Sequence, residues 1–130
     1  MSEHPNVSVV RRLYQAFITR DTVTLGSLIG QDLVLHVPGR SPFGGVHRGV
    51  MEILKVFHES GKLAAHSFKL DVHALLGGVD HVVGLHHISG ARGDRVLNQN
   101  SFLVCHVFQG VLAEVWVGLA DLRQFDEFWS

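Results

Sequence analysis

The sequence predicts one α+β domain, a curved antiparallel or mixed sheet that three N-terminal helices close into a cone-shaped barrel. Two observations of periodicity carry this expectation. Apolar residues recur at helical spacing as far as Gly61, and from Ser67 onwards they recur at every second position. The 130 residues, 46% apolar and 18% charged, suffice for a single core, and no linker, repeat or low-complexity segment divides them. We therefore treat residues 1–130 as one domain.

Two short helices are expected first, joined by a polar turn into a helical hairpin. Pro5 suits a first helical turn, and Asp21 and Thr22 are good N-cap residues for a second helix that Gly30 ends. Tyr14 lies on the apolar stripe of the first helix, so its hydroxyl needs a partner if it is buried, either in a pocket or on the backbone. The stripe consists of Val7, Val10, Leu13, Tyr14, Phe17 and Ile18.

A brief strand, a loop and a third helix follow. Residues 33–37 are apolar around His36, and Pro38-Gly39 stops the strand one residue later. Residues 38–49 are rich in glycine and proline, so we expect a loop that lies across an opening. The third helix ends at Gly61 and carries Val50, Ile53, Leu54 and Phe57 on one face.

Four longer strands complete the chain. They are expected at residues 67–76, 81–89, 97–108 and 111–118, linked by tight turns. His86 and His87 are adjacent, so one faces each side of the sheet, and the sequence leaves open which of them faces inward. Residues 122–129 have helical-turn spacing and are expected to pack back on the body.

The strand at residues 97–108 is apolar on both faces. Phe102, Val104 and Phe108 share one face with His106, and Leu103 lies on the opposite face. Helices can cover only one face of the sheet. The other face therefore predicts a partner subunit, most economically a symmetric homodimer.

Composition argues against several other functions. A formal net charge of −1 gives no footprint for nucleic acid or an anionic membrane surface. The single Cys105 permits no internal disulfide and fits a reducing compartment. No signal-peptide core or membrane-spanning stretch is present, so we expect a cytoplasmic protein. The ten histidines include no pair at metal-ligand spacing, and no metal is expected.

Asp121 is the candidate for chemistry. It follows the last strand, an apolar ribbon that contains Trp116. A carboxylate at the rim of an apolar sheet is poorly solvated, which favours its neutral form and can tune it as an acid or base. The alternative is a helix-capping residue or a surface ion pair.

Two segments carry a family resemblance. The motifs HVPGRSPFGGVHRG (residues 36–49) and EVWVGLADLRQFDEFW (residues 114–129), together with the order of elements, resemble the SnoaL-like polyketide cyclase family. That family belongs to the nuclear transport factor two-like superfamily, which includes ketosteroid isomerase. The resemblance implies a cone-shaped apolar pocket, homodimers formed through the sheet face, an acid/base role for Asp121, a pocket-wall role for Trp116 and a pocket role for His36.

The chain also departs from part of that superfamily. In ketosteroid isomerase the base is an aspartate directly before a proline on the first strand, where this chain has Val37. Tyr14 matches the isomerase's helix-one tyrosine only approximately. Steroid isomerisation by that mechanism is therefore not expected.

Two hypotheses remain open at this point. In the first, a cofactor-free cyclase, isomerase or dehydratase uses Asp121 to remove a proton next to a carbonyl, with His36 and Tyr14 stabilising the enolate. In the second, a non-catalytic module or dimeric scaffold holds a small hydrophobic carbonyl compound in the same pocket. Both assign ligand contact to Trp116, His86, Leu103 and Phe57. A pH–activity profile against β-dicarbonyl compounds would distinguish them.

Overall fold

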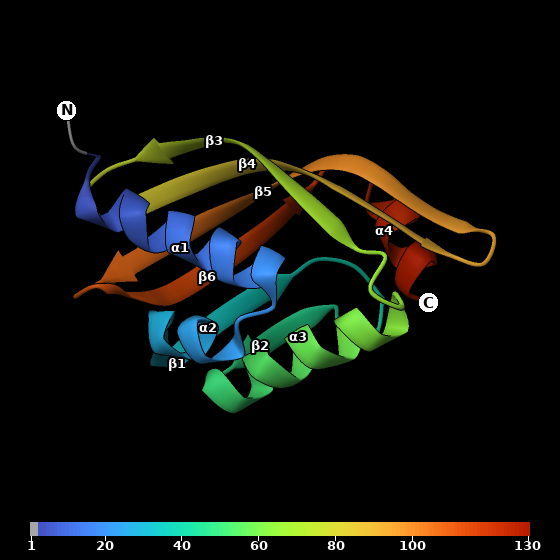
Figure 1. Ribbon diagram of the computed structural model, residues 1–130, viewed down its shortest axis with the longest axis horizontal. Helices are drawn as coiled ribbons and strands as arrows, with labels where there is room; N and C mark the ends of the chain where they lie inside the picture. The colour runs from blue at the N-terminus through green and yellow to red at the C-terminus, as the bar shows by residue number, and fades with distance from the viewer. Residues whose placement is uncertain (1–2) are drawn as a thin grey trace.

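A computed structural model describes residues 3–130 (Figure 1). Residues 3–130 form four helices and six strands in an α+β arrangement. In chain order they are α1 Pro5–Thr19, α2 Thr22–Leu28, β1 Ile29–Val37, β2 Gly45–Arg48, α3 Val50–Leu63, β3 Lys69–Gly77, β4 His81–Arg92, β5 Arg95–Phe108, β6 Val111–Leu119 and α4 Leu122–Trp129.

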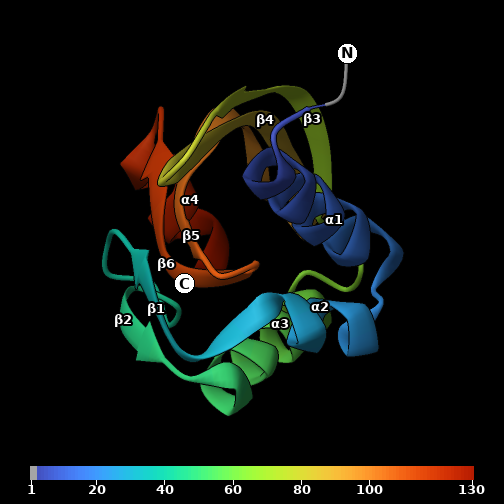
Figure 2. The same cartoon turned by 90° about the vertical axis from the view of Figure 1, so that its left-hand side faces the viewer.

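The six strands form one mixed sheet in the order β2-β1-β6-β5-β4-β3. Only β1 and β6 run parallel, and every other neighbouring pair is antiparallel. The sheet curls strongly, and α1, α2 and α3 complete the ring when the molecule is viewed along its long axis (Figure 2). This confirms the predicted α+β class and the curved sheet covered by helices.

Two details of the prediction are corrected. The sheet is not closed, because β2 and β3 remain its two edges. The three N-terminal helices are also joined by a fourth, α4, and the segment between α2 and α3 contributes two strands, β1 and β2, in place of the one expected. The reason is that β1 hydrogen-bonds into the sheet between β2 and β6, so this insertion is part of the sheet itself.

The segment expected to be a loop contains a strand. Residues Gly45–Arg48 form β2 and pair with β1, where Val37 faces Gly45. Gly39 and Gly45 have φ angles of 97° and 111°, a region that favours glycine, and they allow the chain to reverse between the two strands. The glycine and proline content thus identified the turn correctly but concealed the short strand after it.

The two faces of the sheet differ in cover, and we call them the inner and outer faces. On β4 and β5 the inner face carries Val82, Gly84, His86, Ile88, Leu97, Gln99, Ser101, Leu103, Cys105 and Val107, most of which are buried. The outer face carries His81, Val83, Leu85, His87, Phe102, Val104 and His106. His86 therefore points inward and His87 outward. His106 shares the outer face with Phe102 and Val104, as the alternation predicted.

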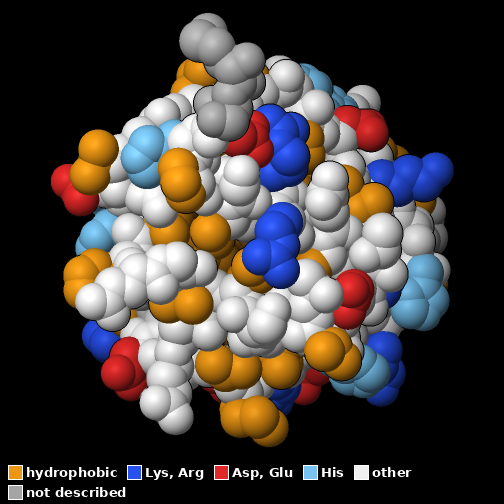
Figure 3. Space-filling view, turned by 60° about the vertical axis from the view of Figure 1, so that its left-hand side comes forward, with side chains coloured by type: hydrophobic (Ala, Val, Ile, Leu, Met, Phe, Trp, Pro, Cys, Tyr) orange, Lys and Arg blue, Asp and Glu red, His pale blue; other side chains and the backbone are white. Residues whose placement is uncertain are grey.

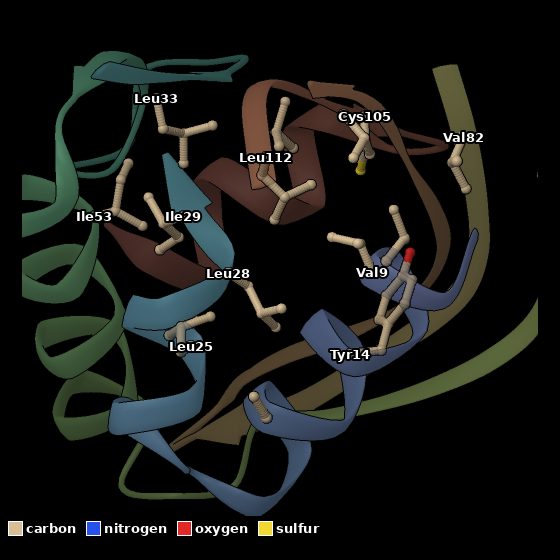
Figure 4. Packing of buried hydrophobic residues seen from close by; sticks show 14 of the residues in the cluster. Val9, Tyr14, Leu25, Leu28, Ile29, Leu33, Ile53, Val82, Cys105 and Leu112 are labelled. Atoms are coloured by element: carbon tan, nitrogen blue, oxygen red, sulfur yellow. The ribbon is translucent and has the colours of Figure 1, made fainter. Parts of the chain in front are cut away.

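Helices and sheet meet in two hydrophobic clusters. The larger cluster joins α1, α2 and β1 to the inner face, where Leu25, Leu28 and Ile29 lie opposite Tyr14 (Figure 4). The smaller one gathers around α4 and includes Phe128 and Trp129. Helix α4 thus packs back on the sheet, as the sequence predicted.

Apolar side chains also reach the surface in small groups between polar ones (Figure 3). On the outer face Leu85 and Phe102 are 38% and 40% exposed. Across residues 3–130 no helix is both long and apolar enough to cross a membrane.

Candidate functional site

The inner face and the helices surround a cavity of about 220 Å³. Its lining comes from α1, α2, α3, α4 and the inner face, and it is almost wholly apolar. Phe17, Ile53, Phe57, Leu103, Val115 and Trp129 represent these walls. Among the described residues, no Asp, Glu, Lys or Arg contributes to the lining, and Tyr14 and His86 are the ionisable groups present.

Tyr14 and His86 form a hydrogen-bonded pair in this cavity. The Tyr14 hydroxyl oxygen lies 2.7 Å from His86 Nδ1, and the two rings meet edge to face at a centroid distance of 5.3 Å. Both residues are buried, at 3% and 4% exposure. The apolar stripe of α1 directs the phenol inward, and the alternation of β4 directs the imidazole to meet it.

Gly84 makes room for this pair. It lies two residues before His86 on the inner face, and a Cβ atom built on it would lie 2.2 Å from the Tyr14 hydroxyl oxygen. Real Cβ atoms do not approach other atoms so closely. The tyrosine can therefore reach the imidazole only because residue 84 has no side chain.

Burial keeps both members of the pair uncharged. Burial first, and then the nearby His73 and His87, lower the pKa of His86 from 6.5 to about 4. Burial also raises the pKa of the Tyr14 hydroxyl, with a further contribution from Cys105. Desolvation disfavours the charged form of each group, so the two pKa values move apart. At neutral pH the pair consists of a phenol and a neutral imidazole.

The neutral pair offers a ligand one donor and one acceptor, whichever tautomer the imidazole adopts. If Tyr14 donates to Nδ1, the His86 Nε2–H is free to donate and the phenol oxygen retains a lone pair. If Nδ1–H donates to the phenol, the hydroxyl hydrogen is free and Nε2 can accept. His86 bonds Tyr14 through Nδ1, and its Nε2 makes no hydrogen bond to residues 3–130. The pair can therefore hold a carbonyl or hydroxyl oxygen.

The serine hydroxyls around the cavity already donate hydrogen bonds to backbone carbonyls. Ser101 donates to the Gly118 carbonyl at 2.8 Å, and Ser60 donates to the Phe57 carbonyl at 3.1 Å. The Trp129 indole nitrogen is the buried side-chain polar atom without a partner in residues 3–130. It is shielded by a set of aromatic neighbours that includes Phe128, at a ring distance of 4.8 Å. We therefore assign Trp129 to the cavity wall and not to the polar anchor.

Four of the predicted site residues line this cavity: Tyr14, His86, Leu103 and Phe57. Helical and strand periodicity placed Tyr14, Phe57 and Leu103, whereas the inward position of His86 rather than His87 is decided by the structure. The sequence reasoning missed Trp129 and Ser101 as lining residues. Ser101 shares its parity on β5 with Leu103, so the same alternation could have found it.

Asp121 does not face the cavity, which corrects the central prediction. It is exposed and is the N-cap of α4, where its carboxylate accepts a hydrogen bond from the Gln124 backbone N–H at 3.0 Å. Its backbone is clamped by Gln99, whose amide both accepts from the Asp121 N–H at 2.9 Å and donates to the Asp121 carbonyl at 2.8 Å. Asp121 lies between the end of β6 and the start of α4, and its carboxylate caps the helix.

His36 and Trp116 lie on the outer face, so the prediction that they line the pocket is also wrong. Their rings stack at 5.5 Å and are nearly parallel, at 3°. His36 Nε2 lies 2.6 Å from a carboxylate oxygen of Glu114, and both side chains are about one-third exposed. The inner positions of β1 are instead Leu33, Leu35 and Val37. Within residues 3–130 no group of three His, Cys, Asp or Glu residues is arranged to hold a metal ion.

Comparisons with known proteins identify relatives along the whole chain. No protein-family profile matches. Bal32a, from a soil-derived mobile gene cassette, is 31% identical, with 97% of each chain covered and a TM-score of 0.92. A protein of unknown function with a cystatin-like fold from Xanthomonas campestris is 26% identical, with coverage of 98% and 99% and the same TM-score of 0.92. An uncharacterised protein of Mycobacterium tuberculosis H37Rv is 24% identical over the full length of both chains.

More distant structures share the fold. An NTF2-like protein from Burkholderia xenovorans LB400 is 16% identical, covers 100% of this chain and 99% of its own, and has a TM-score of 0.83. A proposed polyketide cyclase from Sinorhizobium meliloti is 18% identical, with coverage of 85% and 93% and a TM-score of 0.72. At these identities the likeness is evidence of a common fold.

Proposed function

We propose that this chain, which shares its fold with NTF2-like proteins, belongs to the SnoaL-like family of the nuclear transport factor two-like superfamily and binds a small, uncharged, apolar molecule in its cavity. The Tyr14–His86 pair holds a carbonyl or hydroxyl oxygen of that molecule. The single observation that carries the proposal is a neutral hydrogen-bonding pair, 2.7 Å apart, in an otherwise apolar cavity. Apolar walls with a few convergent polar groups are typical of small-molecule sites.

The cavity volume limits the size of the ligand. An apolar protein cavity of about 150 Å³ binds benzene. The cavity here, at about 220 Å³, is half as large again, which corresponds to roughly nine non-hydrogen atoms at the same packing. A molecule the size of acetophenone fits this estimate. A steroid or a multi-ring polyketide does not fit without opening the walls.

The absence of charged residues among the described lining residues limits which part of a ligand can enter the cavity. An ionised group in a cavity without counter-charges would lose its hydration with no compensation. Tyr14 and His86 are both neutral at pH 7, so they supply hydrogen bonds and no countercharge. The buried part of the ligand is therefore neutral, with one polar oxygen near His86.

The test compares two ligands of equal size. Acetophenone carries a carbonyl oxygen where isopropylbenzene carries a methyl group, so their affinities differ mainly through hydrogen bonding. Each is titrated into the protein and followed by proton–nitrogen correlation spectra. The indole N–H of Trp129 reports the cavity, and that of Trp116, identified through Trp116→Phe, reports the outer face. We expect both ligands to shift the Trp129 signal, and acetophenone to bind about fivefold to tenfold more tightly.

The matched variant is Tyr14→Phe combined with His86→Leu, which replaces both polar partners by apolar groups of similar shape. We expect this variant to bind the two ligands with equal affinity. An acetophenone preference that survives in the variant would contradict the role of the pair. A Trp129 signal that neither ligand moves would contradict the proposal itself.

A second candidate function is catalysis on an activated carbonyl compound. The observation in its favour is the same pair, because a neutral donor beside the carbonyl oxygen stabilises an enolate. His86 would then remove the α-proton, although a pKa of about 4 makes it a weak base. Exchange of the α-protons of acetylacetone in deuterium oxide tests this. Exchange no faster than in buffer alone, or unchanged by His86→Gln, would exclude it.

A homodimer formed through the outer face is also proposed. The supporting observation is a row of side chains in register across the sheet, in which Val46, His36, Trp116, Val104 and Val83 are successive neighbours. Sedimentation equilibrium should give twice the monomer mass. Phe102→Glu, on this face, should yield a monomer, whereas Val23→Glu, at an 83% exposed position on α2, should leave the dimer intact. A monomeric wild-type protein would contradict the proposal.

A further inference from the structure

A groove lies outside one wall of the cavity, between the C-terminal end of α1 and the start of β3. These two elements pack against each other. Its volume is about 230 Å³. We define the groove by its seven lining residues, Phe17, Ile18, Arg20, Phe68, Lys69, Leu70 and Asp71. It differs from the cavity in having charged residues, Arg20, Lys69 and Asp71, among those that line it.

The wall between the groove and the cavity is one side chain thick. Phe17, Phe68 and Leu70 line both spaces, so each of these side chains has one side towards the cavity and another towards the groove. The rings of Phe17 and Phe68 meet edge to face at a centroid distance of 5.8 Å. These three side chains are the shared boundary of the two spaces, so a ligand that spans both would pass between them.

The charges at the groove favour an anion. Arg20 and Lys69 have no carboxylate within salt-bridge distance in residues 3–130, whereas Asp71 contributes a single negative charge. The Arg20 guanidinium lies 4.0 Å from the ring centroid of Phe57, and Phe57 itself lines the cavity. The positive charge is thus fixed directly outside the cavity wall.

We propose that the cavity and the groove form one bipartite site for an amphipathic carboxylate, whose apolar body lies in the cavity and whose anionic end lies in the groove between Arg20 and Lys69. This inference rests on the proposed function and extends it from the buried part of the ligand to the whole molecule. Together the two spaces offer about twice the volume of the cavity alone. The neutral cavity lining and the cationic groove then select opposite ends of the same molecule.

The test uses two probes of the same shape, phenylhexanoate and phenylhexanamide, with the phenyl group at the far end of the chain. They differ in charge at the end that would reach the groove. Binding is measured from the Trp129 indole signal, which reports occupancy of the cavity. Partly exposed ion pairs contribute modestly, so we expect the carboxylate to bind about fivefold more tightly than the amide, with a smaller ratio at high salt.

Three variants assign the effect to the groove. Arg20→Gln combined with Lys69→Gln should reduce the ratio to about one. Asp71→Asn should increase the ratio, a gain that damage to the fold would not produce. Arg123→Gln, at an 88% exposed side chain on α4, changes the net charge away from the groove and should leave the ratio unchanged.

The outcomes separate this inference from the proposed function. Equal affinity of both probes for the wild-type protein, or a preference that persists in the Arg20 and Lys69 double variant, would overturn the bipartite site and leave cavity binding standing. If neither probe moves the Trp129 signal, and acetophenone also does not, both proposals fail. A carboxylate preference lost only in the double variant and raised in Asp71→Asn supports the bipartite site.

Discussion

Protonation of His86 should make the protein lose stability in mild acid, and the size of the loss follows from its burial. The pKa of His86 is about 4 in the folded protein, against 6.5 for an ordinary histidine. Since the folded pKa is the lower one, the unfolded chain takes up the proton first as the pH falls. Stability is therefore lost from about pH 6.5 downwards until the folded pKa is reached. Between pH 7.5 and pH 5 the free energy of unfolding should fall by about 2 kcal/mol on account of this residue alone.

The assay is urea unfolding of the wild-type protein and His86→Gln at several pH values in this range. Glutamine keeps a polar partner for Tyr14 but does not titrate. The difference in unfolding free energy between the two proteins should therefore shrink by about 2 kcal/mol towards pH 5. Parallel curves would refute the reasoning, because they would mean that His86 takes up its proton equally well in the folded and unfolded states.

His87→Gln is the matched control, because it lies one residue away on the outer face. Hydrogen bonds to Asn100 and Asn98 raise the pKa of His87, so its protonated form is favoured by folding. Its contribution is present at low pH and is lost as the pH rises through the folded pKa. The pH trend of this variant relative to wild type should therefore have the opposite sign.

Two further predictions concern the surroundings of the site. Gly84→Ala should displace Tyr14, reduce stability by about 1–3 kcal/mol and abolish acetophenone binding, because its Cβ would lie 2.2 Å from the phenol oxygen. Gly26 lies on α2, and a Cβ atom built on it would meet no atom of another element within 4 Å. Gly26→Ala should therefore stabilise the protein by up to about 1 kcal/mol in the same urea experiment. Asp121→Ala should cost about 1 kcal/mol through loss of the α4 cap, whereas Asp121→Asn should be nearly neutral. Neither Asp121 variant should change acetophenone affinity, and a large loss in Asp121→Asn would restore a pocket role for this carboxylate.

The sequence by itself determined the periodicity of nearly every element and, through it, much of the cavity. The stripe of α1 placed Tyr14, the stripe of α3 placed Phe57, and the alternation of β5 placed Leu103. These assignments succeed because a helix or strand exposes its apolar side to the core wherever it lies in the fold. Short elements inside glycine-rich segments, such as β2, give too few residues for a period to be visible.

Only the tertiary structure decided which face of the sheet is covered. Alternation separates His86 from His87 but does not show which side the helices occupy. On β6, strict alternation would place Trp116 on the same face as the inward Leu112. A bulge between Leu112 and Glu114 shifts the alternation by one residue. Val115 therefore faces the cavity and Trp116 the outer face. Asp121 became a helix cap because the chain reverses there onto α4. Each outcome depends on contacts between distant segments, which a local pattern of residues does not encode.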